Sequence, residues 1–318
     1  FMRVLITGGA GFVGSHYAER LLARGDDVMC IDNYSTGQKS NLKAHANLTV
    51  VEASIADFDT MKQKFEHFKP DAVVHAAASY KDPNDWLTDA DVNVRGTAVV
   101  CQLAKAVGTK RLVYFQTALC YGTKPLQTPI TLDHPILPDG SSYSISKTAG
   151  EQYIRLSGLD YVTFRLANAY GARNLSGPLP TFYKRLTQGQ QCFVTDSRRD
   201  FIHISDLIDC AVKAVDGVGH GAYHISTGSD ISILELYNAV IKALRLNDAK
   251  SPEIKPRHPD DAPSILLDPS RTQKDFGWNA KVSLEKGVAD AIDYYKEYGI
   301  EQTYTHLTAA HQEKAKVA

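Results

Sequence analysis

The stretch Thr7-Gly8-Gly9-Ala10-Gly11-Phe12-Val13-Gly14 carries three glycines at intervals of three residues, between a short apolar run and an amphipathic one. A glycine can take a positive φ in such a turn, and its missing side chain lets the backbone come close to a bound group. A helix that begins here also presents free N–H groups, which favour a phosphate. The pattern predicts a dinucleotide site, although the glycines alone also fit a tight turn in an ordinary α/β protein.

Apolar and amphipathic runs alternate around this turn through the first half of the chain. Runs rich in Val, Ile, Leu and aromatic residues are typical of strands that are covered on both faces. Repeated strand–helix units therefore predict an α/β protein with a parallel, doubly wound sheet. The expected strands are 4–7, 28–32, 48–51, 72–76, 111–117 and 161–166, and the helices between them include 13–23 and 97–106.

The regular alternation fades after Asn168. Glycine and proline cluster at 171–180, a basic helix is expected at 182–186, and strands are expected at 192–195 and 201–204. Ser205 and Asp206 are residue types that cap helices, so we expect the next helix to begin there. An amphipathic helix is predicted at 232–244.

The composition fits a soluble globular enzyme, with 43% hydrophobic and 22% charged residues among 318. A net charge of −1 provides no global field for nucleic acid or an anionic membrane, so we expect neither as a partner. The five cysteines are scattered and lack CxxC or zinc spacing, so we expect reduced thiols, no metal and a cytoplasmic location. No apolar run approaches ~20 residues, and the N-terminus leads directly into a strand, so neither a membrane span nor a signal peptide is expected.

Asp32 ends the second expected strand, about 24 residues after Gly8. An acid at this place can bind the ribose hydroxyls of an adenosine and would repel a 2′-phosphate. Asn33 and Tyr34 follow, with no adjacent Arg or Lys to attract such a phosphate. These residues predict NAD rather than NADP, the alternative being a solvated acid at a strand end.

Further motifs follow in an order that resembles the extended short-chain dehydrogenases/reductases that act on nucleotide sugars. With 16 tyrosines, one YxxxK is expected by chance, so the single motifs are weak and the ordered set is specific. The resemblance covers nearly the whole chain. The matching segments are Thr7 to Gly14 (TGxxGxxG), Asp32-Asn33-Tyr34-Ser35-Thr36-Gly37 (DNxSTG), His75-Ala76-Ala77-Ala78 (HxAA), Asn93-Val94-Arg95-Gly96-Thr97, Tyr143-Ser144-Ile145-Ser146-Lys147 (YxxxK), Arg165-Leu166-Ala167-Asn168 (RxxN), Arg199-Asp200-Phe201-Ile202-His203, Arg257-His258-Pro259-Asp260 and Asp268 to Trp278 (DxS…GW).

The resemblance implies a Rossmann-type doubly wound domain at 1–168 that binds NAD, with a return segment near 201–216. It implies a smaller C-terminal lobe at 169–318 that mainly binds the nucleotide sugar. It also implies a homodimer that packs through helices at 97–106 and 143–155, and a role in polysaccharide biosynthesis. The cofactor contacts that it implies are Gly8, Gly11, Phe12, Val13, Gly14, Asp32, Asn33, Ser35, Thr36, Gly37, Ser54, Ile55, Ala76, Ala77, Ala78, Asn93, Tyr143 and Lys147.

Tyr143 and Lys147 are the expected acid–base pair. Removing hydride from a secondary alcohol requires a base for the hydroxyl proton, and a free tyrosine titrates near ~10. Helical spacing puts Lys147 one turn from Tyr143, where its charge would favour the phenolate. The segment Gln116-Thr117-Ala118-Leu119-Cys120-Tyr121-Gly122 is similar to the family's SSxxVYG, which places Thr117 as a hydrogen-bond donor to the sugar oxygen. Gln116 replaces the usual small residue.

The residues after Thr117 distinguish between the reactions of the family. Dehydratases of this family carry Asp-Glu at 118 and 119, and the decarboxylases carry Glu at 119, whereas this chain has Ala118 and Leu119. Members that epimerise next to a ketone use Cys at 119. Cys120 lies one residue further, where strand alternation would turn it into the core. The resemblance thus implies C4 epimerisation through a transient 4-keto sugar.

The substrate end is expected to hold a nucleoside diphosphate, most simply UDP. The resemblance implies contacts from Lys81, Thr117, Asn168, Arg199, Arg257 and Asp260, with arginine suited to phosphate. Ser54 stands where many relatives have Asp near the adenine, and Arg198 adds a charge that would suit a carboxylated sugar. Either Ser264 or Ile265 would limit the size of the sugar substituent, so hexose and N-acetylhexosamine both stay open.

Two alternative functions remain from the sequence. One is a nucleotide-sugar 4-ketoreductase or dehydrogenase that exchanges NAD(H) at each turnover. The other, of a different class, is a noncatalytic NAD-binding regulatory protein. The complete set Thr117, Tyr143 and Lys147 argues against the second.

Overall fold

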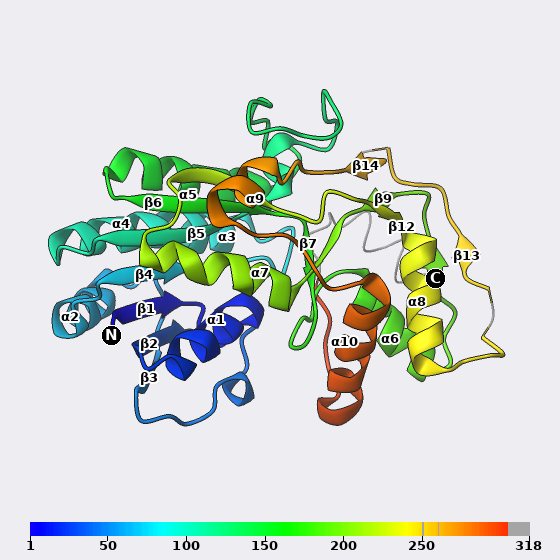
Figure 1. Ribbon diagram of the computed structural model, residues 1–318, viewed down its shortest axis with the longest axis horizontal. Coiled ribbons are helices and arrows are strands. Elements are labelled where there is room, and N and C mark those ends of the chain that lie inside the picture. The colour runs from blue at the N-terminus through cyan, green and yellow to red at the C-terminus, as the bar shows by residue number, and fades with distance from the viewer. Residues whose placement is uncertain (250, 260, 305–318) are drawn as a thin grey trace.

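A single parallel sheet forms the centre of the computed structural model, which describes residues 1–249, 251–259 and 261–304 (Figure 1). The strand order is β11-β6-β5-β4-β1-β2-β3, the doubly wound order that the glycine turn and repeated units predict. The predicted fold class is therefore confirmed. The strands are β1 (Arg3–Thr7), β2 (Asp27–Asp32), β3 (Leu48–Glu52), β4 (Ala72–His75), β5 (Arg111–Thr117), β6 (Tyr161–Leu166) and β11 (Gly221–Ile225).

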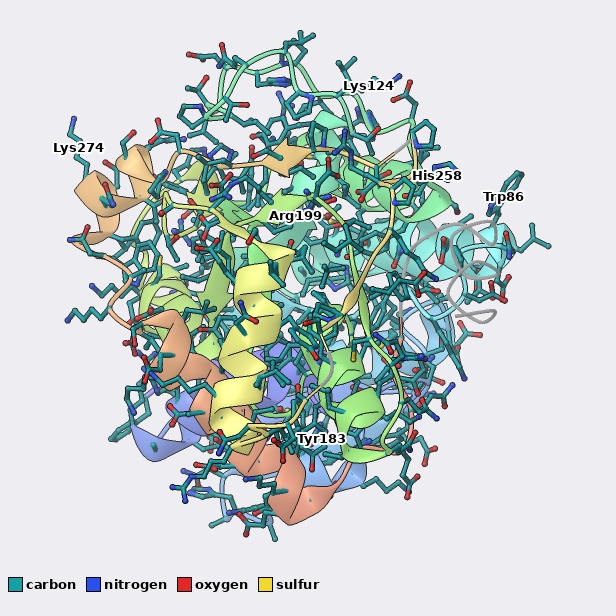
Figure 2. All side chains as sticks on the ribbon, turned by 90° about the vertical axis from the view of Figure 1, so that its right-hand side faces the viewer. Trp86, Lys124, Tyr183, Arg199, His258 and Lys274 are labelled. Carbon is teal, nitrogen blue, oxygen red and sulfur yellow. The ribbon has the colours of Figure 1, made fainter. Side chains whose placement is uncertain are left out.

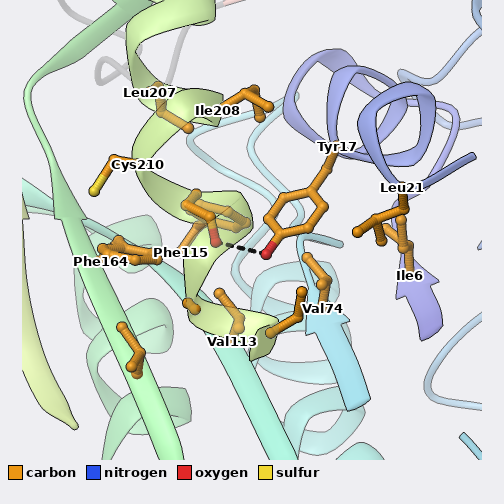
Figure 3. Packing of buried hydrophobic residues seen from close by; sticks show 14 of the residues in the cluster. Ile6, Tyr17, Leu21, Val74, Val113, Phe115, Phe164, Leu207, Ile208 and Cys210 are labelled. Atoms are coloured by element: carbon orange, nitrogen blue, oxygen red, sulfur yellow. Dashed lines mark hydrogen bonds between the residues drawn. The ribbon is translucent and has the colours of Figure 1, made fainter. Parts of the chain in front are cut away.

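Helices cover both faces of the sheet. Val4 and Ile6 point to one apolar cluster and Leu5 to the other, as strand alternation requires. The first cluster takes residues from α1 (Phe12–Ala23) and α7 (Ile204–Ala211), and Tyr17 in it donates its hydroxyl to the Ala211 carbonyl at 2.6 Å (Figure 3). The second takes residues from α2 (Phe58–Phe68), α4 (Gly96–Ala106) and α5 (Ser142–Ser157).

A third apolar cluster lies beside the sheet, under three further helices (Figure 1). They are α6 (Pro178–Thr187), α8 (Ile233–Leu244) and α10 (Leu284–Tyr298). Short strands join this part to the sheet: β7 (Asn168–Tyr170) pairs with β10 (Phe201–His203), β8 (Phe193–Val194) pairs with β13 (Glu253–Ile254), and β9 (Arg198–Arg199) lies between β12 (Ile231–Ser232) and β14 (Ser264–Ile265).

The remaining helices are short. They are α3 (Trp86–Asp89), α9 (Ser270–Phe276), the 3₁₀ helices Lys39–Asn41, Ala118–Tyr121 and Val212–Asp216, and a π-helical segment, Ala90–Arg95, between α3 and α4. In the part of the chain that the structure describes, no helix is long and apolar enough to cross a membrane. The same residues contain no group of three or more His, Cys, Asp or Glu that could hold a metal ion.

Several sequence expectations need correction. Helix α7 begins at Ile204, and its N-cap is His203 rather than Ser205 or Asp206, because the imidazole Nδ1 accepts the Ser205 N–H at 3.2 Å. Helix α6 begins at Pro178, since proline suits the first helical turn. Strand β11 was not predicted. The helix expected at 232–244 forms as α8, with Ser232 and Glu235 in a capping box.

Candidate active site

A cavity of about 1130 Å³ lies at the carboxyl ends of the central strands. Its position matches the crevice of a doubly wound sheet, where the chain turns in opposite directions from β1 and β4. Residues from β7, α6, β8 and β9 close the other side of the cavity. Pockets for one small ligand usually span about 300–1,000 Å³, so this cavity is slightly larger than that range.

The glycines of the turn are required by close packing of the turn against its own backbone and the segment after β4. Gly8 has a φ of +66°, and a Cβ on it would lie 2.7 Å from the Ala77 backbone. A Cβ on Gly14 would lie 2.1 Å from the Gly8 carbonyl oxygen, which explains the third glycine. Gly11 is the N-cap of α1 and offers no side-chain acceptor, so the first N–H groups of α1 stay available to an anion in the cavity.

Asp32 lines the cavity and also organises the loop after β2. Its carboxylate accepts the Ala10 N–H at 3.0 Å and the Tyr34 N–H at 2.8 Å. A Cβ on Gly37 would lie 2.8 Å from Asp32 Oδ2, so the loop packs tightly on the acid. Burial raises the pKa of Asp32, and the two N–H donors oppose that rise.

Most of the predicted cofactor residues line this one cavity. Asn93 does not: it is buried in the π-helical segment, where its side chain bonds the Ser79 N–H and C=O and donates to Ser146 Oγ at 3.0 Å. Asn93 therefore positions the segment at 79 against α5 instead of facing the cavity. The lining residues are Gly8, Gly11, Phe12, Val13, Gly14, Asp32, Asn33, Ser35, Thr36, Gly37, Ser54, Ile55, Ala76, Ala77, Ala78, Tyr143 and Lys147.

Thr117, Tyr143 and Lys147 all line the cavity, although they come from two elements. Thr117 ends β5, and its Oγ1 accepts the Leu119 N–H at 3.1 Å, which starts the 3₁₀ helix Ala118–Tyr121. Tyr143 and Lys147 lie one turn apart at the start of α5, which Ser141 caps. Ser141 Oγ accepts the Ser144 N–H at 3.1 Å.

Burial disfavours the charged form of both members of the pair. It raises the pKa of Tyr143 above its ordinary value, and it lowers the pKa of Lys147 to about 7, with Glu151 opposing that fall. Lys147 Nζ lies 4.3 Å from the centre of the Tyr114 ring, a contact that favours the ammonium. A further positive charge at the cavity would favour the phenolate of Tyr143.

Cys120 lies in the 3₁₀ helix, so the strand alternation that we expected there is wrong. Its side chain is nevertheless fully buried in an apolar cluster, and burial raises the pKa of its thiol to about 12. The expected core position is therefore confirmed for a different geometrical reason. Ala118 and Leu119 both line the cavity and supply no acid or base there.

The expected substrate residues divide into two groups. Lys81, Thr117, Asn168 and Arg199 line the cavity. Arg199 pairs with Asp261 at 2.8 Å and donates to the Ala262 carbonyl at 2.9 Å. Figure 2 shows Arg199 well inside the outline of the molecule, beside the start of α8, whereas Lys124 and Trp86 project from it.

Arg257 is not among the residues that line the cavity, because its guanidinium pairs with Asp196 at 2.7 Å. Arg198 likewise pairs with Asp230 at 3.1 Å and does not line the cavity, contrary to the expected contact with a sugar carboxylate. Ser264 Oγ donates to the same aspartate at 2.9 Å, and Ile265 faces the cavity instead. Asp260 lies outside the described residues.

Sequence reasoning missed several residues of the cavity wall. Tyr80 stacks edge-on against Tyr304 with ring centres 6.2 Å apart, and both line the cavity. Tyr304 is held by its N–H, which donates to the Leu175 carbonyl at 2.8 Å. Arg185 and Phe193 complete this part of the wall. The basic character of the helix around Arg185 was visible in the sequence, whereas no sequence signal links Tyr304 to a motif more than 200 residues away.

Comparisons with known proteins agree with this geometry. A family model described as "NAD dependent epimerase/dehydratase family" matches residues 4–226. A UDP-glucose 4-epimerase from Mycolicibacterium smegmatis is 32% identical over 314 residues, covering 93% of this chain and 99% of that protein. The crystal structure of the Bordetella bronchiseptica enzyme WbmH with NAD⁺ superposes with a TM-score of 0.91 at 56% identity, covering 94% and 99% of the chains. WbmG from the same organism, with NAD and UDP bound, gives 0.88 at 43%, covering 97% and 99%.

Proposed function

The chain belongs to the NAD dependent epimerase/dehydratase family, and from that premise we propose that it is an NAD-dependent UDP-sugar 4-epimerase. One observation carries the choice of reaction. Thr117, Tyr143 and Lys147 all line the cavity, while the two residues after Thr117 are Ala118 and Leu119 and provide no second acid or base. The names of the relatives support both the cofactor and the substrate class, because they are UDP-glucose 4-epimerases and enzymes crystallised with NAD or UDP.

The residues that line the cavity are suited to NAD. Gly8 and Gly14 leave no room for a side chain where the backbone turns, and the start of α1 offers N–H groups for a pyrophosphate. Asp32 is placed for the ribose hydroxyls and disfavours a 2′-phosphate. When bound, NAD supplies an acceptor for the hydride from the sugar carbon and a donor for its return.

The protein's own groups move the proton and hold the sugar. In the proposed reaction the Tyr143 phenolate removes the proton of the 4-hydroxyl, and the Lys147 ammonium stabilises that phenolate. The Thr117 hydroxyl donates a hydrogen bond to the same sugar oxygen. The resulting 4-keto sugar then presents its other face, and Tyr143 returns the proton as the hydride comes back. The hydride and the proton that leave the sugar both return to it, so the reaction has no net oxidation or reduction.

The proposed anchor of the substrate is its diphosphate, which is separated from the reacting carbon of the sugar, so the sugar is left able to turn. Arg199 and Asn168 are the proposed diphosphate contacts, since both line the cavity and lie on the short strands β9 and β7 rather than on α5. Such remote anchoring keeps the ketone close while it rotates. Ile265, rather than Ser264, is the residue that we propose to limit the sugar substituent. In this proposal, residues 1–168 with the segment near 201–216 hold NAD, and 169–318 mainly hold the nucleotide sugar.

We also propose a homodimer that packs through α4 and α5. Ile145, Tyr153 and Leu156 on α5 are 51%, 44% and 79% exposed, which is unusual for one helix face of a monomer. The five cysteines are buried and free, which supports a reducing compartment such as the cytoplasm, where polysaccharide precursors would be its substrates. Sedimentation of the protein and of Leu156→Glu tests the dimer: we expect a dimer for the first and a monomer for the second.

The experiment that tests the function is proton NMR of UDP-glucose, UDP-N-acetylglucosamine and UDP-glucuronate, each incubated with purified protein and no added NAD. A mixture of C4 epimers at unchanged mass is the expected result for at least one sugar. Turnover only after NADH and a 4-keto sugar are added would instead indicate an exchanging reductase. NAD binding without turnover of any sugar would indicate a regulatory protein.

A further inference from the structure

Gln116 supplies the acceptor for the main-chain N–H of Thr117. Strand β5 runs past its neighbour, because β4 ends at His75, which is in register with Tyr114. The Thr117 N–H donates to the side-chain Oε1 of Gln116 at 2.9 Å. Gln116 is only 2% exposed, so this bond is sheltered from water.

The other end of the Gln116 amide reaches α5. Its Nε2 donates to Glu151 Oε2 at 3.0 Å. The second oxygen of Glu151 pairs with Arg165 at 2.7 Å, and Arg165 stands opposite Gln116 on β6. The Glu151 carboxylate is therefore held by Gln116 on one oxygen and Arg165 on the other, and Arg165 also donates to the Tyr121 hydroxyl at 2.8 Å.

The partners fix the orientation of this amide. Its oxygen faces an N–H donor and its nitrogen faces a carboxylate. The flipped amide would set donor against donor and oxygen against oxygen. A small side chain at this position has too few atoms to span from Thr117 to Glu151.

Glu151 lies one helical turn after Lys147 and two after Tyr143, so the three residues share a face of α5. The Gln116 bridge therefore joins the strand end that carries Thr117 to the helix that carries Tyr143 and Lys147. We propose that Gln116 is a positioning residue, which fixes the Thr117 hydroxyl relative to the Tyr143–Lys147 pair in the transition state. The proposal rests on the epimerase function proposed above.

Gln116→Met tests the bridge, since methionine keeps the length of the side chain and removes the hydrogen bonds of the amide with Thr117, Glu151 and Thr148. We expect kcat to fall roughly 10- to 100-fold, the loss typical of a misplacement of about 1 Å. KM should stay within about twofold, because the bridge does not touch Arg199 or Asn168, the proposed diphosphate contacts. Gln63→Met is the matched control, as Gln63 is exposed on α2, away from the cavity and the proposed dimer face, and should leave kcat unchanged. Melting temperature and bound NAD are measured for each variant.

Gln116→Glu tests the same bridge through pH. A protonated glutamic acid can donate to Glu151 and accept from Thr117, as glutamine does. An ionised one places two carboxylates together and breaks the bridge. We therefore expect kcat close to wild type at low pH and a fall with rising pH that the wild type does not show. If Gln116 only filled space, the pH profiles of kcat for Gln116→Glu and the wild type would be parallel.

Hydrogen exchange of the segment 112–121 gives a readout that does not depend on turnover. The Thr117 amide should exchange faster in Gln116→Met than in the wild type. An active wild type with an equally active Gln116→Met would overturn the proposal. If Gln116→Met does not fold, parallel pH profiles for Gln116→Glu and the wild type would overturn it. A wild type inactive on every UDP-sugar counts against the proposed function instead, and the exchange rate then decides whether Gln116 holds Thr117.

Discussion

Tyr143 is the residue whose proton moves in the proposed reaction. Burial raises its pKa, so the phenolate needs nearby positive charge to form. Lys147 sits one turn away but is itself buried, and its pKa is lowered to about 7. Burial therefore disfavours both the Tyr143 phenolate and the Lys147 ammonium, and whether they form depends on what the cavity binds.

Tyr143→Phe should keep NAD and lose most turnover. The phenyl ring preserves packing in the cavity wall and removes the group that carries the proton. General acid–base groups contribute roughly 10²–10⁴-fold, so kcat should fall by about that factor. The released NAD after heat treatment, measured by absorbance, should match the wild type. Unchanged turnover would show that another group moves the proton.

Lys147 should make the protein less stable at low pH than at high pH. In the folded protein its pKa is about 7, below the ordinary value of 10.5, so the unfolded chain binds more protons between these pH values. The cost of the buried ammonium is complete below pH 7 and disappears as pH rises toward 10.5. Lys147→Met should therefore raise the melting temperature at pH 6, and the gain over wild type should shrink by pH 10. A gain that grows with pH would contradict the depressed pKa.

The site residues that sequence could predict are those in local motifs. The glycine turn, Asp32 and the Tyr143–Lys147 spacing are each read from a few adjacent residues. Arg257 does not line the cavity because it pairs with the carboxylate of Asp196, and the sequence motif does not predict this ion pair. The role of Gln116 was invisible for a similar reason, since its partner Glu151 comes from another element.

At the scale of elements, the inner strands of the central sheet were predictable because they are continuous apolar runs buried on both faces, whereas of the two edge strands the largely exposed β3 was predicted and β11 was missed. The short strands β8 and β10 lie in the runs expected at 192–195 and 201–204, whereas β7, β9, β12 and β14 were not predicted, because two or three residues are too few to show an alternating pattern. They form where segments distant in sequence meet, as β9 does between β12 and β14. These short strands also hold Asn168 and Arg199, so the substrate side was harder to predict than the cofactor side.

Helix α10 offers a test of local stability away from the reacting groups. Ser283 caps it by accepting the Lys286 N–H at 3.2 Å. Ser283→Ala should lower the free energy of unfolding by about 1 kcal/mol, whereas Ser283→Asp should retain the cap. Urea denaturation measures both, and kcat should not change in either variant. An alanine variant as stable as the wild type would mean that the cap contributes nothing to α10.

At the scale of the whole molecule, the segment after α10 returns to the cavity. The Lys184 ammonium donates to the Glu301 carbonyl at 2.8 Å, and Tyr304 meets Tyr80 across the cavity. Both tyrosines line the cavity, so this segment forms part of the cavity wall. A 4-epimerase has to retain its cofactor between the two hydride transfers, and this part of the wall can serve that need.

Tyr304→Ala should accelerate the loss of NAD. Removing the ring opens the wall beside Tyr80 without touching the glycine turn or Asp32. We expect less NAD to copurify and turnover to become dependent on added NAD. Tyr298→Ala, an exposed tyrosine on α10, is the control and should retain NAD. Equal NAD content in both variants would show that Tyr304 does not hold the cofactor in place.

The most direct test of the proposed reaction follows the hydrogen at C4. A UDP-sugar that the protein converts is labelled with deuterium at C4 and incubated in ordinary water with no added NAD, and both epimers are examined by NMR. Hydride transfer to a retained cofactor and back predicts that deuterium stays at C4 in both epimers. Replacement of the deuterium by solvent protons, or interconversion only with added NAD(H), would contradict a self-contained 4-epimerase.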